Sequence, residues 1–209
     1  MNDTTTTVPD AVVAMITERF ADRYEGIFSE DTIRRCIAES YGLLAEGATV
    51  ASFLPLVTEN FVAQRLRAVA HTEGKLPREC PRVLFVCDDN AGRSQVAAVL
   101  LQRAADGRIE VSSAAGRRPA PIDETLKTTL LELDVDLDNA FAKPLTDDLV
   151  RAADVVVTMG CGDACPVYPD KHYEDWDIDD PTGKPIEQVR AIRDKIAEKV
   201  EDLLQRLPP

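Results

Sequence analysis

The sequence predicts an α/β fold with a parallel sheet, preceded by a small all-helical bundle. Two observations carry this prediction. Apolar residues recur at helical spacing from about residue 8 to 74, and from Pro81 onward short apolar runs alternate with helical patterns. The intervening segment 73–77 has the composition of a linker. We therefore expect two domains, a three-helix bundle at residues 1–76 and an α/β domain at residues 77–209.

Three helices account for the N-terminal pattern. Their apolar stripes are Val12, Val13, Ile16 and Phe20, then Ile33, Ile37, Tyr41 and Leu44, and finally Leu56, Val57, Phe61, Val62, Leu66 and Val69. Breaks are expected at residues 26–29 and around Gly47. Cys36 lies beside the second stripe and is expected in the core. Homodimer contact, partner docking and simple stabilisation are all compatible roles for this bundle.

The α/β pattern follows in order. The expected strands are Arg82–Val86, Ile109–Ser113 and Asp154–Thr158, and the expected helices lie near 94–105, 122–133 and 146–151. A last helix carries an apolar stripe from Val189 to Leu207, with Pro185 near its start. This stripe should pack on the sheet.

The junction between the first strand and the next helix carries the main motif. It places Cys87 at the strand end and, after five intervening residues, Arg93 and Ser94. Backbone N–H groups and a helix N-terminus attract a tetrahedral oxyanion, the arginine fork grips two of its oxygens, and the same field favours a nucleophilic thiolate. The predicted oxyanion-binding residues are Asp88, Asp89, Asn90, Ala91, Gly92, Arg93 and Ser94. A merely structural cysteine would leave this pattern unexplained.

Two further cysteines follow the strand at Asp154–Thr158. In open α/β sheets ligands bind at the carboxyl ends of the strands, so Cys161 and Cys165 should lie at the same edge as Cys87. Thiols that can reach a nucleophilic cysteine suit a disulfide relay. The alternative is a loop that happens to carry two thiols. Cys80 precedes the first strand and should lie at the opposite end of the sheet.

An acidic segment provides a candidate general acid. Asp180 directly precedes Pro181, which holds its backbone extended and lets its carboxyl project toward a site. Burial beside a bound anion would favour the protonated carboxyl that general acid catalysis needs. Asp179 and Asp177 are weaker candidates, and a solvated acidic turn is the alternative.

Composition restricts the function classes. The 209 residues carry a net charge of -13, which argues against nucleic acid or an anionic membrane as a partner. Neither a secretory leader nor a membrane-length apolar run is present in the sequence, so a cytoplasmic location is expected. His71 and His172 do not stand at metal-ligand spacing, so no metal is expected.

The residues from Cys87 to Ser94, followed much later by Asp180 and Pro181, resemble the low-molecular-weight tyrosine phosphatase family over roughly residues 81–207. Within that family the stretch 159–166 is similar to bacterial arsenate reductases, and Thr182 stands where phosphatases usually have tyrosine. The bundle resembles a three-helix domain found ahead of some bacterial reductase domains. The resemblance implies a four-stranded parallel sheet with helices on both faces and an oxidoreductase of arsenic resistance.

The resemblance also implies a mechanism. Cys87 attacks arsenate held by Arg93 and the loop amides, while Asp180 protonates the departing hydroxide. Cys161 then attacks Cys87 and releases arsenite, and Cys165 attacks Cys161 to pass the disulfide to thioredoxin. No bound cofactor is implied, because an external thiol supplies the electrons.

Several alternatives stay open. Only three residues separate Cys161 from Cys165, fewer than in the usual thioredoxin-coupled pattern, and a related class uses mycothiol with mycoredoxin or glutaredoxin. The order in which Cys161 and Cys165 attack is also open. A phosphatase would use Cys87, Arg93 and Asp180 and leave the other two thiols idle. Phosphate or sulfate would fit the same pocket. A redox-sensing or interaction protein is a third possibility.

Overall fold

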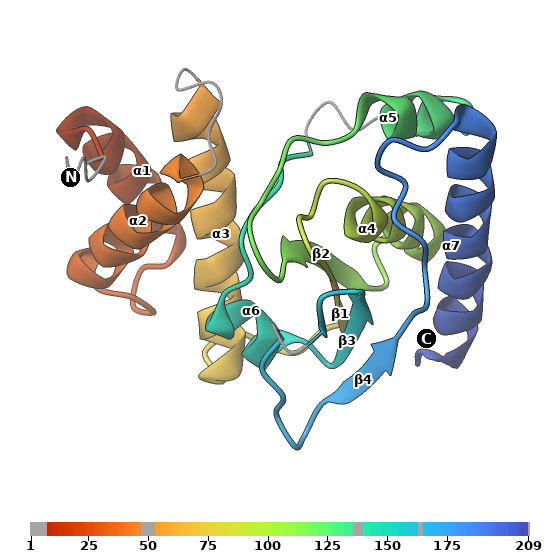
Figure 1. Ribbon diagram of the computed structural model, residues 1–209. Helices are drawn as coiled ribbons and strands as arrows, with labels where there is room; N and C mark the ends of the chain where they lie inside the picture. Colours follow the sequence, from red (N-terminus) through yellow and green to blue (C-terminus); the bar gives the residue numbers. More distant parts are fainter. Residues whose placement is uncertain (1–7, 47–52, 136–139, 163–164, 209) are drawn as a thin grey trace. The chain divides into compact units, whose positions relative to one another are not determined.

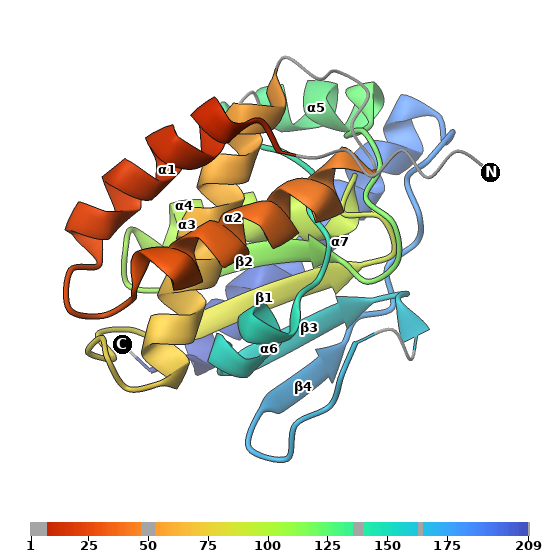
Figure 2. The same ribbon diagram turned by 90° about the vertical axis from the view of Figure 1, so that its left-hand side faces the viewer.

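The computed structural model describes residues 8–46, 53–135, 140–162 and 165–208. The chain divides into two compact units, Met1–Pro77 and Arg78–Pro209. Figures 1 and 2 show the helical make-up of the first unit and the central sheet of the second. None of the helices in the described ranges has both the length and the apolar character needed to cross a membrane.

The first unit consists of three helices, as expected. They are α1 (Asp10–Arg23), α2 (Glu30–Ala45) and α3 (Leu54–Thr72). The side chain of Ser29 caps α2 by accepting a hydrogen bond from the backbone N–H of Thr32 at 3.2 Å. The predicted break at residues 26–29 therefore lies between α1 and α2, whereas the one around Gly47 falls outside the described residues.

A shared apolar core holds these helices together. It contains residues from each of the three predicted stripes, namely Ile16, Phe20, Ile33, Ile37, Val62 and Leu66. Cys36 belongs to the same core, as its place beside the second stripe predicts. The removal of these side chains from water is what stabilises short helices that would be marginal in isolation.

The second unit is built on a four-stranded parallel sheet. Its strands are β1 (Arg82–Cys87), β2 (Glu110–Ala115), β3 (Val155–Met159) and β4 (His172–Asp175), in the order β2-β1-β3-β4. All three neighbouring pairs run parallel. The four-stranded parallel sheet is thereby confirmed, and the three strands located in the sequence are correct to within a residue or two.

Strand β4 was not located from the sequence. It has only four residues, lies at an edge of the sheet and leaves its side chains half-buried or exposed. A strand of this kind carries neither an apolar run nor a clear alternation, so only its pairing with β3 defines it.

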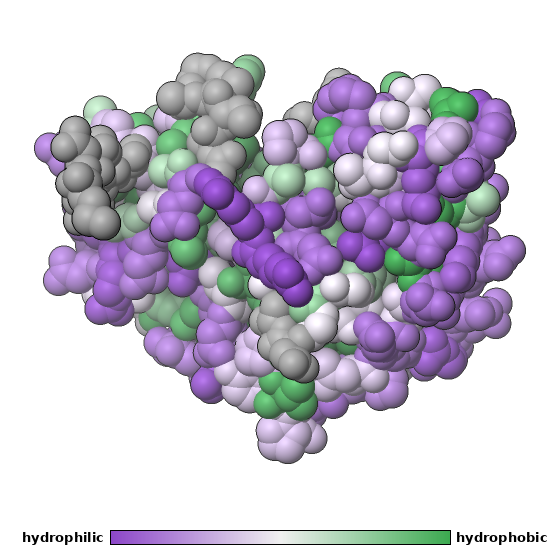
Figure 3. Space-filling view, in the orientation of Figure 1, coloured by the Kyte–Doolittle hydropathy of each residue, from purple (hydrophilic) through white to green (hydrophobic). Residues whose placement is uncertain are grey.

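Helices cover the two faces of the sheet unequally. Helices α4 (Arg93–Ala105) and α7 (Ile186–Arg206) lie on one face, and the short α6 (Asp147–Ala152) lies on the other. The predicted stripe of α7 is buried at Val189, Ile196 and Leu203 among other positions. Its outer face is largely hydrophilic in Figure 3. This amphipathic division explains why α7 packs where the sequence predicts.

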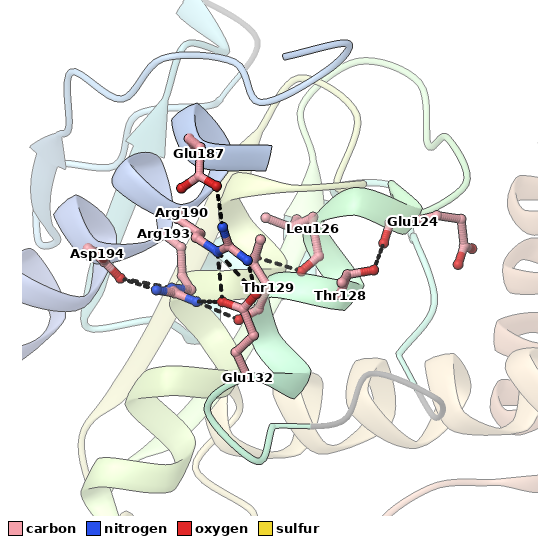
Figure 4. A network of polar contacts seen from close by, with 9 residues as sticks. All are labelled: Glu124, Leu126, Thr128, Thr129, Glu132, Glu187, Arg190, Arg193 and Asp194. Carbon is pink, nitrogen blue, oxygen red and sulfur yellow. Dashed lines mark hydrogen bonds and ion pairs between the residues drawn. The ribbon is translucent and has the colours of Figure 1, made fainter. Parts of the chain in front are cut away.

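Helix α5 (Glu124–Leu131) is fastened to α7 by a polar network shown in Figure 4. Glu132, which follows α5, receives hydrogen bonds from Arg190 at 2.6 and 3.0 Å and from Arg193 at 3.0 Å. Arg193 also donates to the carbonyl of Thr129 at 2.6 Å. The bond to Thr129 satisfies one of the free carbonyls at the end of α5, and the bonds to the Glu132 carboxylate couple that end to the C-terminal helix.

Register places the site at one edge of the sheet. Cys87 at the end of β1 pairs with Met159 at the end of β3. The segments that follow these two residues therefore emerge side by side at the carboxyl edge, which is where α/β sheets bind ligands.

Candidate active site

The segment from Cys87 to Gly92 turns its carbonyl groups toward a neighbouring stretch of chain. Four of these carbonyls accept hydrogen bonds of 2.8–3.2 Å from backbone N–H groups of residues 116–123, namely those of Cys87, Asp88, Asp89 and Ala91. Carbonyl oxygens repel an anion, so their engagement on the outer side suits the loop to bind negative charge. Helix α4 begins directly after Gly92 and adds the positive end of its dipole.

The thiol of Cys87 is buried and lies beside a directed hydroxyl. Its Sγ is 2.9 Å from Ser94 Oγ. The side-chain N–H of Asn90 donates to that same oxygen at 2.8 Å, which leaves the Ser94 O–H free to point at sulfur. Asn90 has a φ of +52°, a left-handed conformation that asparagine tolerates better than most residues. Asn90 thus orients the Ser94 hydroxyl so that it can donate a hydrogen bond to the Cys87 sulfur.

A second layer of contacts supports Asn90, and the sequence did not reveal it. The carboxamide N–H₂ of buried Gln95 donates to Asn90 Oδ1 at 3.1 Å and to the carbonyl of Phe141 at 3.0 Å. The backbone N–H of Lys143 donates to the same Asn90 oxygen at 3.1 Å. Gln95 is recognisable only from its position beside Ser94, whereas residues 141–143 carry no local signal.

Lys143 brings a cation into this layer. Its Nζ lies 5.0 Å from the centre of the Phe141 ring, and the side chain is almost fully buried. Burial lowers the pKa of Lys143 to about 8. The ring face compensates part of the lost hydration of the ammonium group.

Arg93 lies against three segments of the chain. These are its own loop, the segment after β3 and the segment that leads to Asp180. Its guanidinium donates to the carbonyl of Ile178 at 3.2 Å and lies 3.7 Å from the Asp88 carboxylate. A Cβ placed on Gly160 would be only 2.7 Å from Arg93 Nη1, and Gly160 has a φ of +80°. Gly160 is therefore glycine for two reasons, close approach and conformation.

Gly92 brings the loop close to the Asp180–Pro181 segment. A Cβ at Gly92 would lie 3.2 Å from the Pro181 ring. Glycine at this position leaves the space that the neighbouring proline occupies.

Asp180 is exposed, and its carboxyl accepts a hydrogen bond from the backbone N–H of Thr182 at 2.9 Å. Partial burial raises its pKa, but the bonds from Thr182 and the charges of Arg93 and Lys184 outweigh it, so the pKa of Asp180 is lowered overall. The expectation of a raised value concerned the anion-bound site, where a negative ligand would offset Arg93. Without that ligand the carboxyl is ionised.

Cys161 and Cys165 lie in the segment after β3, and both are buried and unpaired. Burial raises the pKa of Cys161, and the negative charges of Asp88 and Cys87 act in the same direction. Burial raises the pKa of Cys165 to about 11, with a further contribution from Cys161. Residues 163 and 164 of this predicted motif fall outside the described residues.

The remaining candidates are the other two acidic residues of the Asp180 segment and Cys80. Asp177 and Asp179 are exposed, and Asp179 lies 4.0 Å from the ammonium of Lys184. Cys80 precedes β1 at the end of the sheet opposite to Cys87. Within the described ranges there is no group of three or more histidine, cysteine or acidic residues arranged to hold a metal ion.

Comparison with protein families gives two matches. Residues 82–208 match the model described as low molecular weight phosphotyrosine protein phosphatase. Residues 13–70 match the protein-tyrosine-phosphatase-like N-terminal domain. The two matches correspond to the sheet-containing unit and to the three helices.

Individual relatives are similar over one or both units. A thioredoxin-dependent arsenate reductase of Corynebacterium glutamicum is 41% identical, with a TM-score of 0.85 over 95% of this chain and 97% of that chain. A glutaredoxin arsenate reductase of Synechocystis is 30% identical over 60% of this chain and 98% of its own length. An arginine phosphatase of Geobacillus stearothermophilus is 28% identical, with a TM-score of 0.53 over 60% of this chain and 92% of that chain.

The cysteine-arginine loop at the end of β1, the parallel sheet that carries it and the match over residues 82–208 agree with one another. The chain belongs to the low molecular weight phosphotyrosine protein phosphatase family.

Proposed function

We propose that this chain reduces arsenate to arsenite, with Cys87 as nucleophile and Cys161 and Cys165 as a disulfide relay to an external thiol protein. The observation that carries the proposal is the presence of Cys161 beside Cys87 at the carboxyl ends of β1 and β3, close enough for their charges to interact. The similarity to arsenate reductases over both units supports the same reaction.

In the first step the Cys87 thiolate attacks arsenic while Arg93 and the loop N–H groups hold the arsenate oxygens. A sulfur–arsenic bond forms and an arsenic–oxygen bond breaks. The departing oxygen takes a proton and leaves as water, and Asp180 is the proposed donor. The charge of bound arsenate counteracts Arg93, which raises the proton affinity of the Asp180 carboxyl.

In the second step the Cys161 sulfur attacks the Cys87 sulfur. Because the pKa of Cys161 is raised, its thiol gives up a proton in this step, and the departing arsenite takes that proton. A disulfide forms between the two cysteines, and the electron pair of the sulfur–arsenic bond passes to arsenic, which leaves as arsenite. Cys161 is proposed to attack first because the charge of Cys87 acts on it, whereas the thiol that acts on Cys165 is Cys161.

In the third step Cys165 attacks Cys161 and releases the Cys87 thiolate for another cycle. The Cys161–Cys165 disulfide is then reduced by a dithiol protein, and thioredoxin is the proposed reductant because the relative that covers 95% of this chain is thioredoxin-dependent. With the pKa of Cys165 at about 11, its thiol is protonated at neutral pH, so this step requires the thiol to move toward water or a base.

The family also contains phosphatases, and the same loop would serve phosphate transfer. A phosphatase has no use for Cys161 and Cys165. Both are buried in this chain, Cys161 within electrostatic reach of Cys87 and Cys165 within reach of Cys161. Some hydrolysis of aryl phosphates can accompany arsenate reduction, because the first step uses the same oxyanion pocket.

The decisive assay is arsenate-dependent oxidation of NADPH with thioredoxin and thioredoxin reductase. The native chain is compared with Cys161→Ser and Cys165→Ser variants, and Cys36→Ser, in the helical core, serves as the control. We expect turnover for the native and control chains and none for the other two variants.

Other outcomes redirect the assignment. Activity only with mycothiol and mycoredoxin, with Cys87 alone essential, would replace the relay by an external thiol. If no reductant supports arsenate reduction and an aryl phosphate is hydrolysed rapidly, the chain is a phosphatase.

A further inference from the structure

The loop whose N–H groups and arginine attract anions also carries two carboxylates. Asp89 is already engaged, because its Oδ1 accepts a hydrogen bond from the backbone N–H of Ala91 at 3.0 Å and lies 3.7 Å from Cys87 Sγ. The other carboxylate is that of Asp88. Asp88 directly follows the nucleophile Cys87, and its side chain is about 39% exposed. A carboxylate at this position repels the fully deprotonated oxygens of a tetrahedral ligand, so the oxyanion function alone does not account for it.

The surroundings of Asp88 show what its two oxygens face. Oδ2 lies 3.7 Å from Arg93 Nη2, the guanidinium proposed to grip the ligand. Oδ1 lies 3.3 Å from Nε of the exposed Arg117, yet it is shielded from solvent and accepts no hydrogen bond within the described part of the chain. A carboxylate oxygen that is shielded from water and accepts no hydrogen bond raises the free energy of the folded protein, and a ligand that donates a hydrogen bond to it would remove this cost.

We propose that Asp88 is a specificity-determining residue that accepts a hydrogen bond from a protonated oxygen of the bound oxyanion. Arg93 and the loop N–H groups hold the deprotonated oxygens, while Asp88 receives the O–H of the remaining one. The site then takes oxyanions that keep a proton near neutral pH, such as hydrogen arsenate and hydrogen phosphate. It excludes tetrahedral anions without a proton, of which sulfate is the simplest.

The chemistry of this selection is asymmetric. A carboxylate that meets a ligand hydroxyl gains a charge-assisted hydrogen bond. When the ligand has no proton, the same carboxylate faces a bare negative oxygen and gains no hydrogen bond to offset the repulsion. Sulfate and phosphate have nearly the same shape, so discrimination between them reports on the proton alone.

This inference deepens the proposed function, since it concerns which form of oxyanion the same loop accepts. Its test uses binding without turnover, so that it can fail while arsenate reduction stands, and the reverse. The reduced full-length chain is titrated with inorganic phosphate and with sulfate by isothermal calorimetry, in a mildly alkaline buffer in which phosphate is chiefly the hydrogen phosphate dianion and so has the same charge as sulfate.

The native chain should bind phosphate more tightly than sulfate by about tenfold or more. In Asp88→Asn the charge is gone and the new amide donates, so sulfate should bind more tightly and the ratio should fall to within about twofold. Asp88→Ser repeats the test with a smaller side chain, and circular dichroism establishes that each variant is folded.

Two control variants separate this role from simpler ones. Asp106→Asn removes an equal charge at the far end of α4, where the residue has a φ of +47° that asparagine tolerates. Arg117→Gln removes the exposed partner of Asp88. Both should keep the native ratio.

The proposal is overturned if the folded Asp88 variants keep the native preference for phosphate. It is also overturned if Arg117→Gln or Asp106→Asn narrows the ratio as much as Asp88→Asn does. In the first case Asp88 does not contact the proton of the ligand. In the second case the preference comes from net charge, if Asp106→Asn reproduces the effect, or from the ion pair between Arg117 and Asp88, if Arg117→Gln does.

Discussion

The two cysteine-bearing segments at the carboxyl edge of the sheet are built in opposite ways. The loop 87–94 is braced by four backbone bonds on its outer side and by the Asn90, Ser94 and Gln95 contacts on its inner side. The segment after β3 instead contains two glycines with positive φ, Gly160 and Gly162. The first arrangement fits a site that must be preorganised for an anion, and the second fits a segment whose thiols must change partners.

The largest effect is expected where the two segments touch. Gly160→Ala places a methyl group 2.7 Å from Arg93 Nη1 in a backbone conformation unsuited to alanine, so the guanidinium must shift. We expect kcat/KM for arsenate to fall by about 10²-fold, as for a misplacement of about 1 Å.

The control for this variant is Gly107→Ala. Gly107 has the same φ of +80° but no atom within 4 Å of the added methyl, so it reproduces the backbone strain without the collision. It should lose about 1 kcal/mol of stability and keep its turnover. Equal losses of turnover in both variants would remove Arg93 from the explanation.

A smaller effect is expected from the bracing of the oxyanion loop. Gln95→Leu removes the donors to Asn90 and to the Phe141 carbonyl, which frees Asn90 to turn the Ser94 hydroxyl away from the sulfur. We expect about a tenfold fall in kcat/KM. The rate of Cys87 alkylation at neutral pH should fall in parallel, a readout that a purely structural loss would not change.

The matched control is Gln102→Leu, an exposed glutamine on the same helix. If that variant alkylates as slowly as Gln95→Leu, the bracing of Asn90 is irrelevant to thiolate formation.

The thiol segment can be tested through pH. Because the pKa of Cys165 is raised to about 11, its alkylation in a Cys87→Ser/Cys161→Ser/Cys36→Ser/Cys80→Ser chain should be slow at neutral pH. The rate should rise about tenfold per pH unit and level off above the ordinary pKa of a free thiol, but below pH 11 because the charge of Cys161 is absent from this chain. A plateau near the ordinary pKa of a free thiol would show that Cys165 is open to water and not buried.

The smallest effect concerns the edge strand that leads to the Asp180 segment. Glu174 of β4 has its pKa lowered to about 2 by hydrogen bonds from Arg206, opposed by burial and assisted by Trp176. A lowered carboxyl pKa stabilises the fold above the ordinary value of 4.5 and is lost as pH falls toward about 2.

Water screens the half-exposed Arg206, so we expect Glu174→Gln to cost about 1 kcal/mol at neutral pH and less in acid. Urea unfolding at several pH values measures this difference. Glu201→Gln, an exposed change on α7, is the control and should leave the pH dependence as in the native chain. A constant difference between Glu174→Gln and native at all pH values would exclude the ion pair as its cause.

The sequence predicted those features whose residues lie close together along the chain. The Cys87–Ser94 spacing, Asp180 before Pro181 and the apolar stripe of α7 are each contained in a short stretch of chain. Gly160 and Gln95 could not be identified as site residues, because their importance comes from Arg93 and Phe141, which are distant in sequence. The lowered pKa of Asp180 was likewise invisible, since Arg93 helps to produce it.

Helix α5 is held at its two ends by different forces. At its start the backbone N–H of Asp123 donates to the carbonyl of Ala91 in the oxyanion loop, an uncharged bond of 3.2 Å. At its end Glu132 is held by Arg190 and Arg193, and such partly exposed charges are weakened by salt. High ionic strength should therefore increase amide hydrogen exchange at the C-terminal end of α5 while the end that touches the oxyanion loop keeps its protection.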